Sequence, residues 1–337
     1  MAFYETLKLE KAFYQQDGGF CAALERADPS GQYNGTELED LTALERQLKR
    51  FDIHVSGTKS DRVEKFFSTA DSALLFPAYI GTAVEQGMEK GNILSHILAT
   101  KTEIHAMDYR SILPMPDPKE RELAEVLEGG FIPETTITLK ENLVQLKKRG
   151  RILRASYEAL KFQRIDLFSV ALRQMGAQIA RTAIKDAVRV LIEGDGNNNA
   201  AEVVQTANSG SISYSDLCAL WGKFAEHEMN ALLVSPKTGN EILSLPELRT
   251  LGDGARFAAP GSFTTPFGAV LLKTAAVPEG MVVALDKDCA LEMVTAGGIS
   301  VEYDKVIDCQ MERVGITCIT GFAKLYPDAV KVLKVKE

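Results

Sequence analysis

The sequence lacks the long apolar stretches that a membrane or secreted chain needs. No apolar run approaches the roughly 20 residues of a membrane helix; among the longest are residues 281–285 and the interrupted run 267–272. The first eleven residues carry Glu5 and contain no apolar core, unlike a secretory signal. We therefore expect a chain that stays in the reducing cytoplasm and has no membrane partner.

Cysteine and histidine are scarce, and their spacing fits neither disulfide nor metal chemistry. The five cysteines are odd in number and include no Cys-x-x-Cys pair, so no disulfide framework and no structural zinc site are expected. The four histidines show no metal-ligand spacing, and the start of a zincin motif at His227-Glu228 is not completed. The sequence thus predicts no metal and no cofactor.

Catalytic motifs are present only as fragments. Residues 56–59 match S-x-x-K and residues 237–239 match K-T-G, but the third element of this serine-hydrolase signature, S-D-N, is absent. A calcium-loop pattern begins at Asp195, yet its sixth and twelfth positions are Ala200 and Thr206, where Gly and Glu are required. We expect a structural or binding protein and no enzyme, with a serine hydrolase as a distant alternative.

Positive charge is also in deficit. The chain has 38 Lys and Arg against 46 Asp and Glu, a net charge of -8, which argues against a protein that binds nucleic acid by displacing counterions. Residues 1–120 carry 13 basic and 19 acidic side chains, whereas residues 140–164 carry eight basic and two acidic ones. The basic band is either a solvated face or a contact surface for an acidic partner, such as another copy of the chain.

Apolar periodicity predicts the elements that are present. The length of 337 residues indicates about two domains. Thr36 and Glu39 form a capping-box pattern ahead of a short helix in a separate N-terminal segment; further helices are expected over 61–70 and from Pro77 to Gly91. Residues 103–155 change to a β period, which predicts two long strands joined by an irregular tip.

One long helix is the clearest element. Apolar residues recur every three or four positions from Ile165 to Leu191, which predicts a helix of about 30 residues ending at the glycines of 194–197. Residues 200–298 indicate a mixed α/β region, with a helix over 213–230 that places Trp221 on its apolar face. A long β region interrupted near Asp304 and a final strand close the chain.

The order of these elements resembles that of the major capsid proteins of tailed bacteriophages with the Hong Kong 97 fold. Residues 128–160 (EGGFIPETTITLKENLVQLKKRGRILRASYEAL) look like that family's extended loop returning to the body. Residues 166–197 look like its spine helix with a terminal Gly-Asp-Gly-Asn turn, and residues 299–333 are similar to its peripheral strands and last axial strand. The resemblance does not extend to the first 70 residues.

The resemblance implies an α+β, Hong Kong 97-like fold with four parts after an N-terminal extension. The implied boundaries are a helical extension (1–72), an N-terminal arm (73–105), an extended β-hairpin loop (106–156), a peripheral domain with the spine helix (157–197 and 299–323) and an axial α/β domain (198–298 and 324–337).

The resemblance also implies a function. The chain would be the major capsid protein of a tailed double-stranded DNA bacteriophage or prophage, assembled in the host cytoplasm into the pentamers and hexamers of an icosahedral virion shell. Its partners would be itself, a portal, and any scaffolding or decoration proteins, and it would enclose DNA without sequence-specific contacts. The alternative is an encapsulin-like bacterial shell that holds cargo enzymes.

Charge then suggests which residues meet between subunits. Glutamates outnumber basic residues in the loop tip, 119–134, and would face basic side chains of another copy. The candidate interface residues are Glu122, Glu125, Glu128, Glu134, Lys147, Lys148, Arg149, Arg173, Arg181, Asp304 and Lys305.

Some members of this family join subunits by an isopeptide bond between a loop Lys and an Asn on the peripheral strands. Lys140 is a possible donor by position, but residues 299–322 contain no Asn. We therefore expect a shell held by non-covalent contacts.

Overall fold

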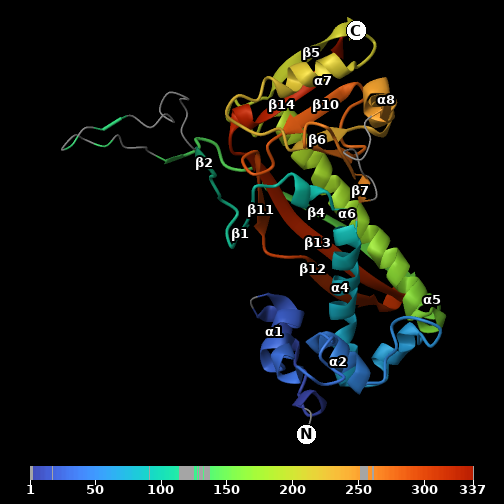
Figure 1. Ribbon diagram of the computed structural model, residues 1–337. Helices are drawn as coiled ribbons and strands as arrows, with labels where there is room; N and C mark the ends of the chain where they lie inside the picture. Colours follow the sequence, from blue (N-terminus) through green and yellow to red (C-terminus); the bar gives the residue numbers. More distant parts are fainter. Residues whose placement is uncertain are drawn as a thin grey trace. The chain divides into compact units, whose positions relative to one another are not determined.

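The computed structural model describes residues 3–16, 18–90, 92–113, 125–126, 128, 132, 137–250, 257–259 and 262–336. The chain forms two compact units, and each is described by itself. Unit 1 comprises residues 1–92, 148–180 and 297–319; unit 2 comprises residues 93–147, 181–296 and 320–337. Two elements contribute to both units: the helix α6 (Ile165–Glu193) and the strand β13 (Met311–Lys324) (Figure 1).

Unit 1 is mainly helical. Its α-helices are α1 (Gly19–Ala27), α2 (Ala43–Arg50), α3 (Ala70–Ala73), α4 (Leu75–Lys90), α5 (Tyr157–Phe162) and the first half of α6. The 3-10 turns are Phe3–Glu5, Lys11–Gln15, Ser30–Tyr33 and Val63–Phe67. The capping box lies at Thr42 and Glu45, so the predicted box at Thr36 is wrong, and α2 begins only at Ala43.

The N-terminal segment is not separate from the rest of unit 1. Phe20 and Leu44 lie in the same hydrophobic core as Phe76, Phe168 and Ile316. A fully buried ion pair between Arg46 and Asp28, 2.8 Å long, ties α2 to the end of α1. The expectation of an independent segment is therefore wrong, because its apolar faces are buried against α4, α6 and β13.

Glycines allow α4 and α6 to approach unusually closely within unit 1. A Cβ atom at Gly87 would lie 2.1 Å from the carbonyl oxygen of Arg173, and one at Gly176 would lie 2.0 Å from that of Val84. Any side chain at these two positions would push the helices apart. The helix from Pro77 is confirmed, with its start two residues earlier at Leu75 and its last described residue at Lys90.

The strands of unit 1 are β12 (Ser300–Val306), the first part of β13, and β4 (Lys147–Ser156), nearly all of which lies in this unit. β12 pairs antiparallel with β13, from Ser300 opposite Thr317 to Val306 opposite Met311, and β4 also pairs with β13. The break between β12 and β13 is the 3-10 turn Ile307–Cys309, so the predicted interruption near Asp304 falls a few residues too early.

Unit 2 contains a seven-stranded sheet in the order β5-β14-β10-β6-β9-β8-β7. Its strands are β5 (Glu202–Ser209), β6 (Ala231–Val234), β7 (Phe257–Ala259), β8 (Ser262–Thr264), β9 (Val270–Lys273), β10 (Met281–Leu285) and β14 (Val330–Lys336). The β14–β5 and β6–β9 pairs are parallel and the others antiparallel.

Helices cover both faces of this sheet. Successive residues of a strand point to opposite faces: Leu233 lies in one core with Ile184 and Leu191 of α6, whereas Leu232 lies in another with Leu217 of α7. The helices of the second face are α7 (Tyr214–Trp221), α8 (Pro236–Leu243) and α9 (Pro246–Thr250). The predicted mixed α/β region is confirmed, but α7 ends at Trp221, whose side chain is exposed and not apolar-facing as expected.

The remaining strands of unit 2 are β1 (Thr100–Ile104), β2 (Ile112–Leu113), β3 (Thr138–Leu139) and β11 (Leu291–Ala296). β1 pairs parallel with β11, and β11 pairs antiparallel with residues 320–324 of β13. Among the described residues of the predicted loop, only β2 and β3 pair with each other. The expectation of two long paired strands is therefore wrong for the described residues, because β1 and β4 pair with β11 and β13 instead. No helix in the described ranges is long and apolar enough to cross a membrane.

Candidate functional site: the anchor of the extended loop

A buried lysine fastens the returning side of the extended loop to other parts of unit 2. Lys140 is only 3% exposed, and its Nζ donates to the Oδ2 of Asp195 at 2.7 Å and to the carbonyl oxygen of Lys324. The backbone N–H of Lys324 donates to the same Asp195 oxygen at 3.0 Å. We call Lys140, Asp195 and Lys324 the loop anchor; it connects the loop, the turn after α6, and β13.

The turn after α6 holds Asp195 in place. Gly194 ends the helix with φ +89°, a left-handed conformation that favours glycine. Asn197 donates to Asp195 Oδ1 from its side chain at 2.9 Å, and the Asp195 N–H donates to the side-chain oxygen of Asn199 at 3.0 Å. Asn142, in the loop, donates to the carbonyl oxygen of Gly196 at 2.8 Å. The Gly-Asp-Gly-Asn turn therefore both caps the helix and holds the loop through hydrogen bonds.

Charge and burial shift the pKa values of two anchor groups. Burial alone would raise the pKa of Asp195, but the hydrogen bonds from Lys140 and Asn197 and the Lys140 charge together hold it below its usual range. Burial, aided by the positive charges of Lys331 and Lys140 and opposed by Asp195, lowers the pKa of Lys324 to about 8. The Lys324 ammonium donates to the carbonyl oxygen of Leu191 at 3.2 Å.

A second buried carboxylate fixes the outgoing side of the loop. Glu292, on β11, is 3% exposed and accepts hydrogen bonds from Thr102 at 2.6 Å, Tyr109 at 2.7 Å and Ser111. Burial and the adjacent Glu292 carboxylate raise the pKa of Tyr109, so its hydroxyl stays protonated and able to donate. Both ends of the loop are thus held by buried polar side chains.

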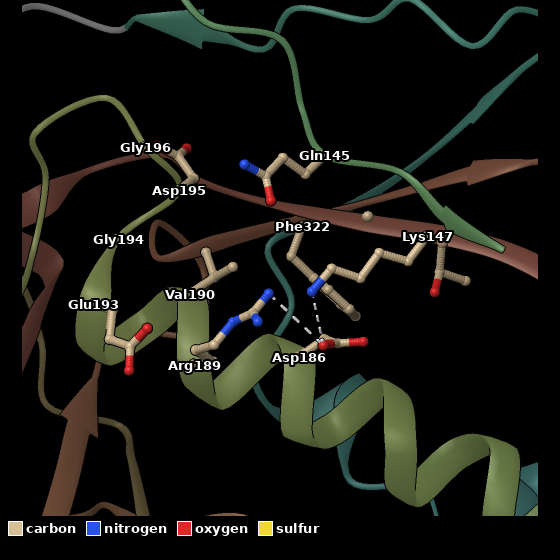
Figure 2. Close-up of a pocket in the computed structure, with 12 residues that line it drawn as sticks. Gln145, Lys147, Asp186, Arg189, Val190, Glu193, Gly194, Asp195, Gly196 and Phe322 are labelled. Atoms are coloured by element: carbon tan, nitrogen blue, oxygen red, sulfur yellow. Dashed lines mark hydrogen bonds and ion pairs between the residues drawn. The ribbon is translucent and has the colours of Figure 1, made fainter. Parts of the chain in front are cut away.

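A pocket of about 240 Å³ lies beside the anchor, at the C-terminal end of α6 (Figure 2). Asp186 accepts there from Lys147 at 3.2 Å and lies 3.8 Å from Arg189. Glu193 and Asp195 also line it. Its charged groups are suited to binding a polar or charged chain segment.

The structure places the predicted interface residues in different settings. Glu125 and Glu128 are exposed, whereas Glu122 and Glu134 lie outside the described residues. Lys148 and Arg181 are exposed. The remaining members of the set are half-buried or paired within the chain: Lys147 with Asp186, Arg173 with Ser169 at 2.9 Å, and Arg149, which is half-buried.

Asp304 and Lys305 form pairs across β12 and β13. Asp304 contacts Arg313 at 2.6 Å and Lys305 contacts Glu312 at 3.3 Å, as their register in the sheet requires. The K-T-G fragment, residues 237–239, lies in the first turn of α8, whose N-cap is Ser235.

The loop anchor itself was not predicted from the sequence. The sequence suggests Lys140 only as a cross-link donor, and Asp195 only as part of a helix end and as the start of an incomplete calcium-loop pattern. Glu292 has no local sequence signal for its role, because its partners lie more than 100 residues away along the chain. The only signal for Lys324 is its place within the otherwise apolar β pattern Phe322–Leu325.

Comparison with known proteins fits this architecture. Residues 140–305, which include Lys140, Asp195 and Glu292 of the two loop attachments, match the phage capsid protein family. Over these residues the chain is similar to the phage capsid protein family. No curated protein sequence matches this chain.

Solved structures show that this capsid protein has the Hong Kong 97-like fold. It superimposes on the capsid of an empty GTA particle with a TM-score of 0.54 at 15% identity, covering 72% of this chain and 89% of that chain. The capsid of cyanophage P-SCSP1u gives 0.53 at 14% identity, with 73% and 88% covered. The SrpI encapsulin of Synechococcus elongatus PCC 7942 gives 0.53 at 16% identity, with 73% and 89% covered. The predicted fold class and family are confirmed, and the protein is a major capsid protein.

Proposed function

We propose that this capsid protein assembles with copies of itself into the pentamers and hexamers of an icosahedral shell that encloses the double-stranded DNA of a tailed phage or prophage. The match to the phage capsid family across the spine helix and the returning side of the loop, from residue 140 on, carries this proposal. Assembly would take place in the bacterial cytoplasm with a portal and any scaffolding or decoration proteins, and the subunit would have no enzymatic role.

The charge of the chain supports a passive container. With a net charge of -8, the subunit has no excess of cations to grip packaged DNA, so contacts to the genome would be few and independent of sequence. In this proposal residues 1–72 form the N-terminal extension, 73–105 the arm and 106–156 the extended loop. Residues 157–197 and 299–323 form the peripheral domain, and 198–298 with 324–337 the axial domain.

Expression of the full chain followed by negative-stain electron microscopy tests the proposal. We expect closed shells or ring-shaped capsomers in the purified material. A protein that remains monomeric at high concentration, with and without a co-expressed scaffold from the same phage, would contradict it.

An encapsulin-like shell is the second candidate. The SrpI encapsulin and a virus-like particle from Pyrococcus furiosus align with TM-scores of 0.53 and 0.52, as well as the phage capsids do. The two candidates differ in contents: a phage shell is filled through a portal with DNA, whereas an encapsulin holds protein cargo. Nucleic-acid and protein content of particles from the native source separates them.

We also propose that the acidic loop tip contacts a neighbouring subunit. Glu125 and Glu128 are exposed, and Lys148 and Arg181 offer exposed cations on another copy. Glu122, Glu134, Arg149 and Arg173 belong to the same proposed contact, while Lys147 is engaged by Asp186 within its own chain. Asp304 and Lys305 would contribute through the β12–β13 hairpin.

Charge reversal tests this contact. The double variant Glu125→Lys, Glu128→Lys should lower particle yield and weaken assembly further at low salt, because each exposed pair contributes only about 0–1 kcal/mol but recurs at every subunit. The matched control is Glu89→Lys, an exposed glutamate on α4. If the double variant and the control assemble equally well at every salt concentration, the proposed contact is wrong.

A further inference from the structure

Three loops of the seven-stranded sheet meet at one end of its strands β6, β10 and β14. β6 begins where β10 ends and β14 begins, since Leu285 pairs with both Ala231 and Val330. The segment before β6 carries His227, the turn after β10 carries Asp286 and Cys289, and the 3-10 turn before β14 carries Asp328. The topology therefore gathers residues that the sequence separates by up to about 100 positions.

These side chains bring nitrogen, oxygen and sulfur ligands together. One ligand atom each from His227, Asp286 and Cys289 lie within 4.8 Å of one another. His227 Nε2 also lies 3.4 Å from Oδ2 of Asp328, and Nδ1 lies 3.8 Å from Oδ2 of Asp286. In a tetrahedral zinc site the ligand atoms are about 3.3–3.7 Å apart, given bonds of about 2.0–2.3 Å. Small side-chain movements would close the cluster around an ion.

The imidazole has an unused coordinating atom. His227 Nε2 is buried and makes no hydrogen bond within the described part of the chain, and the ring packs 5.6 Å from that of Tyr326. A buried polar atom without a partner is costly. Binding a cation would satisfy it, whereas the Asp286 carboxylate is already oriented by hydrogen bonds from the N–H groups of Glu228 and Asp288.

From this geometry we propose that His227, Asp286 and Cys289 bind a divalent transition-metal ion, with Zn²⁺ as the preferred class. A thiolate and an imidazole select zinc over Mg²⁺ or Ca²⁺, which prefer oxygen ligands only. Binding releases the thiol proton of Cys289 to solvent, and Asp286, Asp328 and the thiolate then offset the ion's charge.

Asp286, Asp288 and Asp328 place negative charge around Cys289, which favours a bound cation. The ion would connect the three loops at this end of the strands. The inference goes beyond the proposed shell assembly and does not depend on it.

Metal binding by the purified full chain tests the proposal. After removal of metals with a chelator, titration with Zn²⁺ should show one ion bound per chain and a rise in melting temperature that Mg²⁺ does not reproduce. Cys289→Ser should weaken Zn²⁺ binding by at least about 100-fold, since loss of even an outer-shell partner weakens metal sites by about 10–100-fold. Cys218→Ser, a half-buried cysteine on α7, is the matched control and should bind as the wild type does.

Cobalt provides a measurement on the unaltered protein. The Co²⁺ complex of the wild type should show a thiolate-to-metal charge-transfer band that Cys289→Ser lacks. Absence of Zn²⁺ binding by the wild type, equal binding by Cys289→Ser, or a Co²⁺ spectrum without a thiolate band would each overturn the proposal. If Cys289→Ser does not fold, the wild-type Co²⁺ spectrum alone decides.

Discussion

Replacing Lys140 with methionine tests the loop anchor most directly. Methionine preserves most of the length and apolar volume of the side chain but removes the ammonium group. The substitution deletes the 2.7 Å ion pair with Asp195 and the hydrogen bond to the carbonyl oxygen of Lys324. Asp195 keeps its bonds from the Lys324 N–H and from Asn197.

The magnitude follows from these contacts. A buried hydrogen bond between charged groups contributes about 1.5–3 kcal/mol, and one to a neutral carbonyl about 1 kcal/mol. Removing one partner of a buried ion pair costs about 3–5 kcal/mol, because the other charge remains buried. Since Asp195 retains other donors, we expect Lys140→Met to lower the free energy of unfolding of unit 2 by about 3 kcal/mol. The combined Lys140→Met, Asp195→Asn variant should cost less than the sum of the two single changes.

Urea unfolding and hydrogen exchange measure the two consequences. The unfolding midpoint of unit 2 should fall, and amides of residues 138–147 should exchange faster, because the loop loses its attachment. Lys185→Met, at an exposed position on α6, is the control and should change neither quantity. Unfolding of Lys140→Met within about 0.5 kcal/mol of the wild type, with unchanged exchange in the loop, would refute the reasoning.

Three further predictions follow from particular contacts. The pKa of Lys324 is about 8 in the folded state and 10.5 in the unfolded state, so the unfolded state binds more protons between these pH values. The free energy of unfolding should therefore rise with pH in this range by up to about 3 kcal/mol. A pH series of urea melts should show the rise in the wild type and not in Lys324→Met. Gly87→Ala should destabilise unit 1 by about 1–3 kcal/mol in thermal melts, because its Cβ would lie 2.1 Å from a backbone oxygen. Gly81→Ala on the same helix has its nearest contact at 3.5 Å and should be neutral or stabilising by up to about 1 kcal/mol. Equal effects of the two substitutions would contradict the close packing of the helices. Mature particles boiled in detergent and reductant should give a single band near 36.9 kDa, since the Lys140 amine is buried and paired and so is not available as a cross-link donor; a ladder of larger species would show a covalent bond elsewhere.

Local sequence patterns predicted the elements whose apolar period is long and regular. The 29-residue helix α6 follows from the apolar residues between Ile165 and Leu191, and its end follows from Gly194. The buried strands β6 and β10 are short apolar runs, and the family resemblance rests on the order of these same elements. A helix or strand that buries one continuous face reveals its period in the chain itself.

Tertiary structure alone decided the partners of polar residues. Thr36 and Thr42 both head a capping-box pattern, and only packing of α2 onto the N-terminal core selects Thr42. Asp195, Glu292 and His227 carry no local signature of their role, because a buried charge is stabilised by whichever groups the fold brings within about 3 Å of it. The sequence by itself therefore determined the fold and the family of this capsid protein. The loop anchor and the histidine–aspartate–cysteine cluster exist only because non-adjacent strands and turns meet in three dimensions.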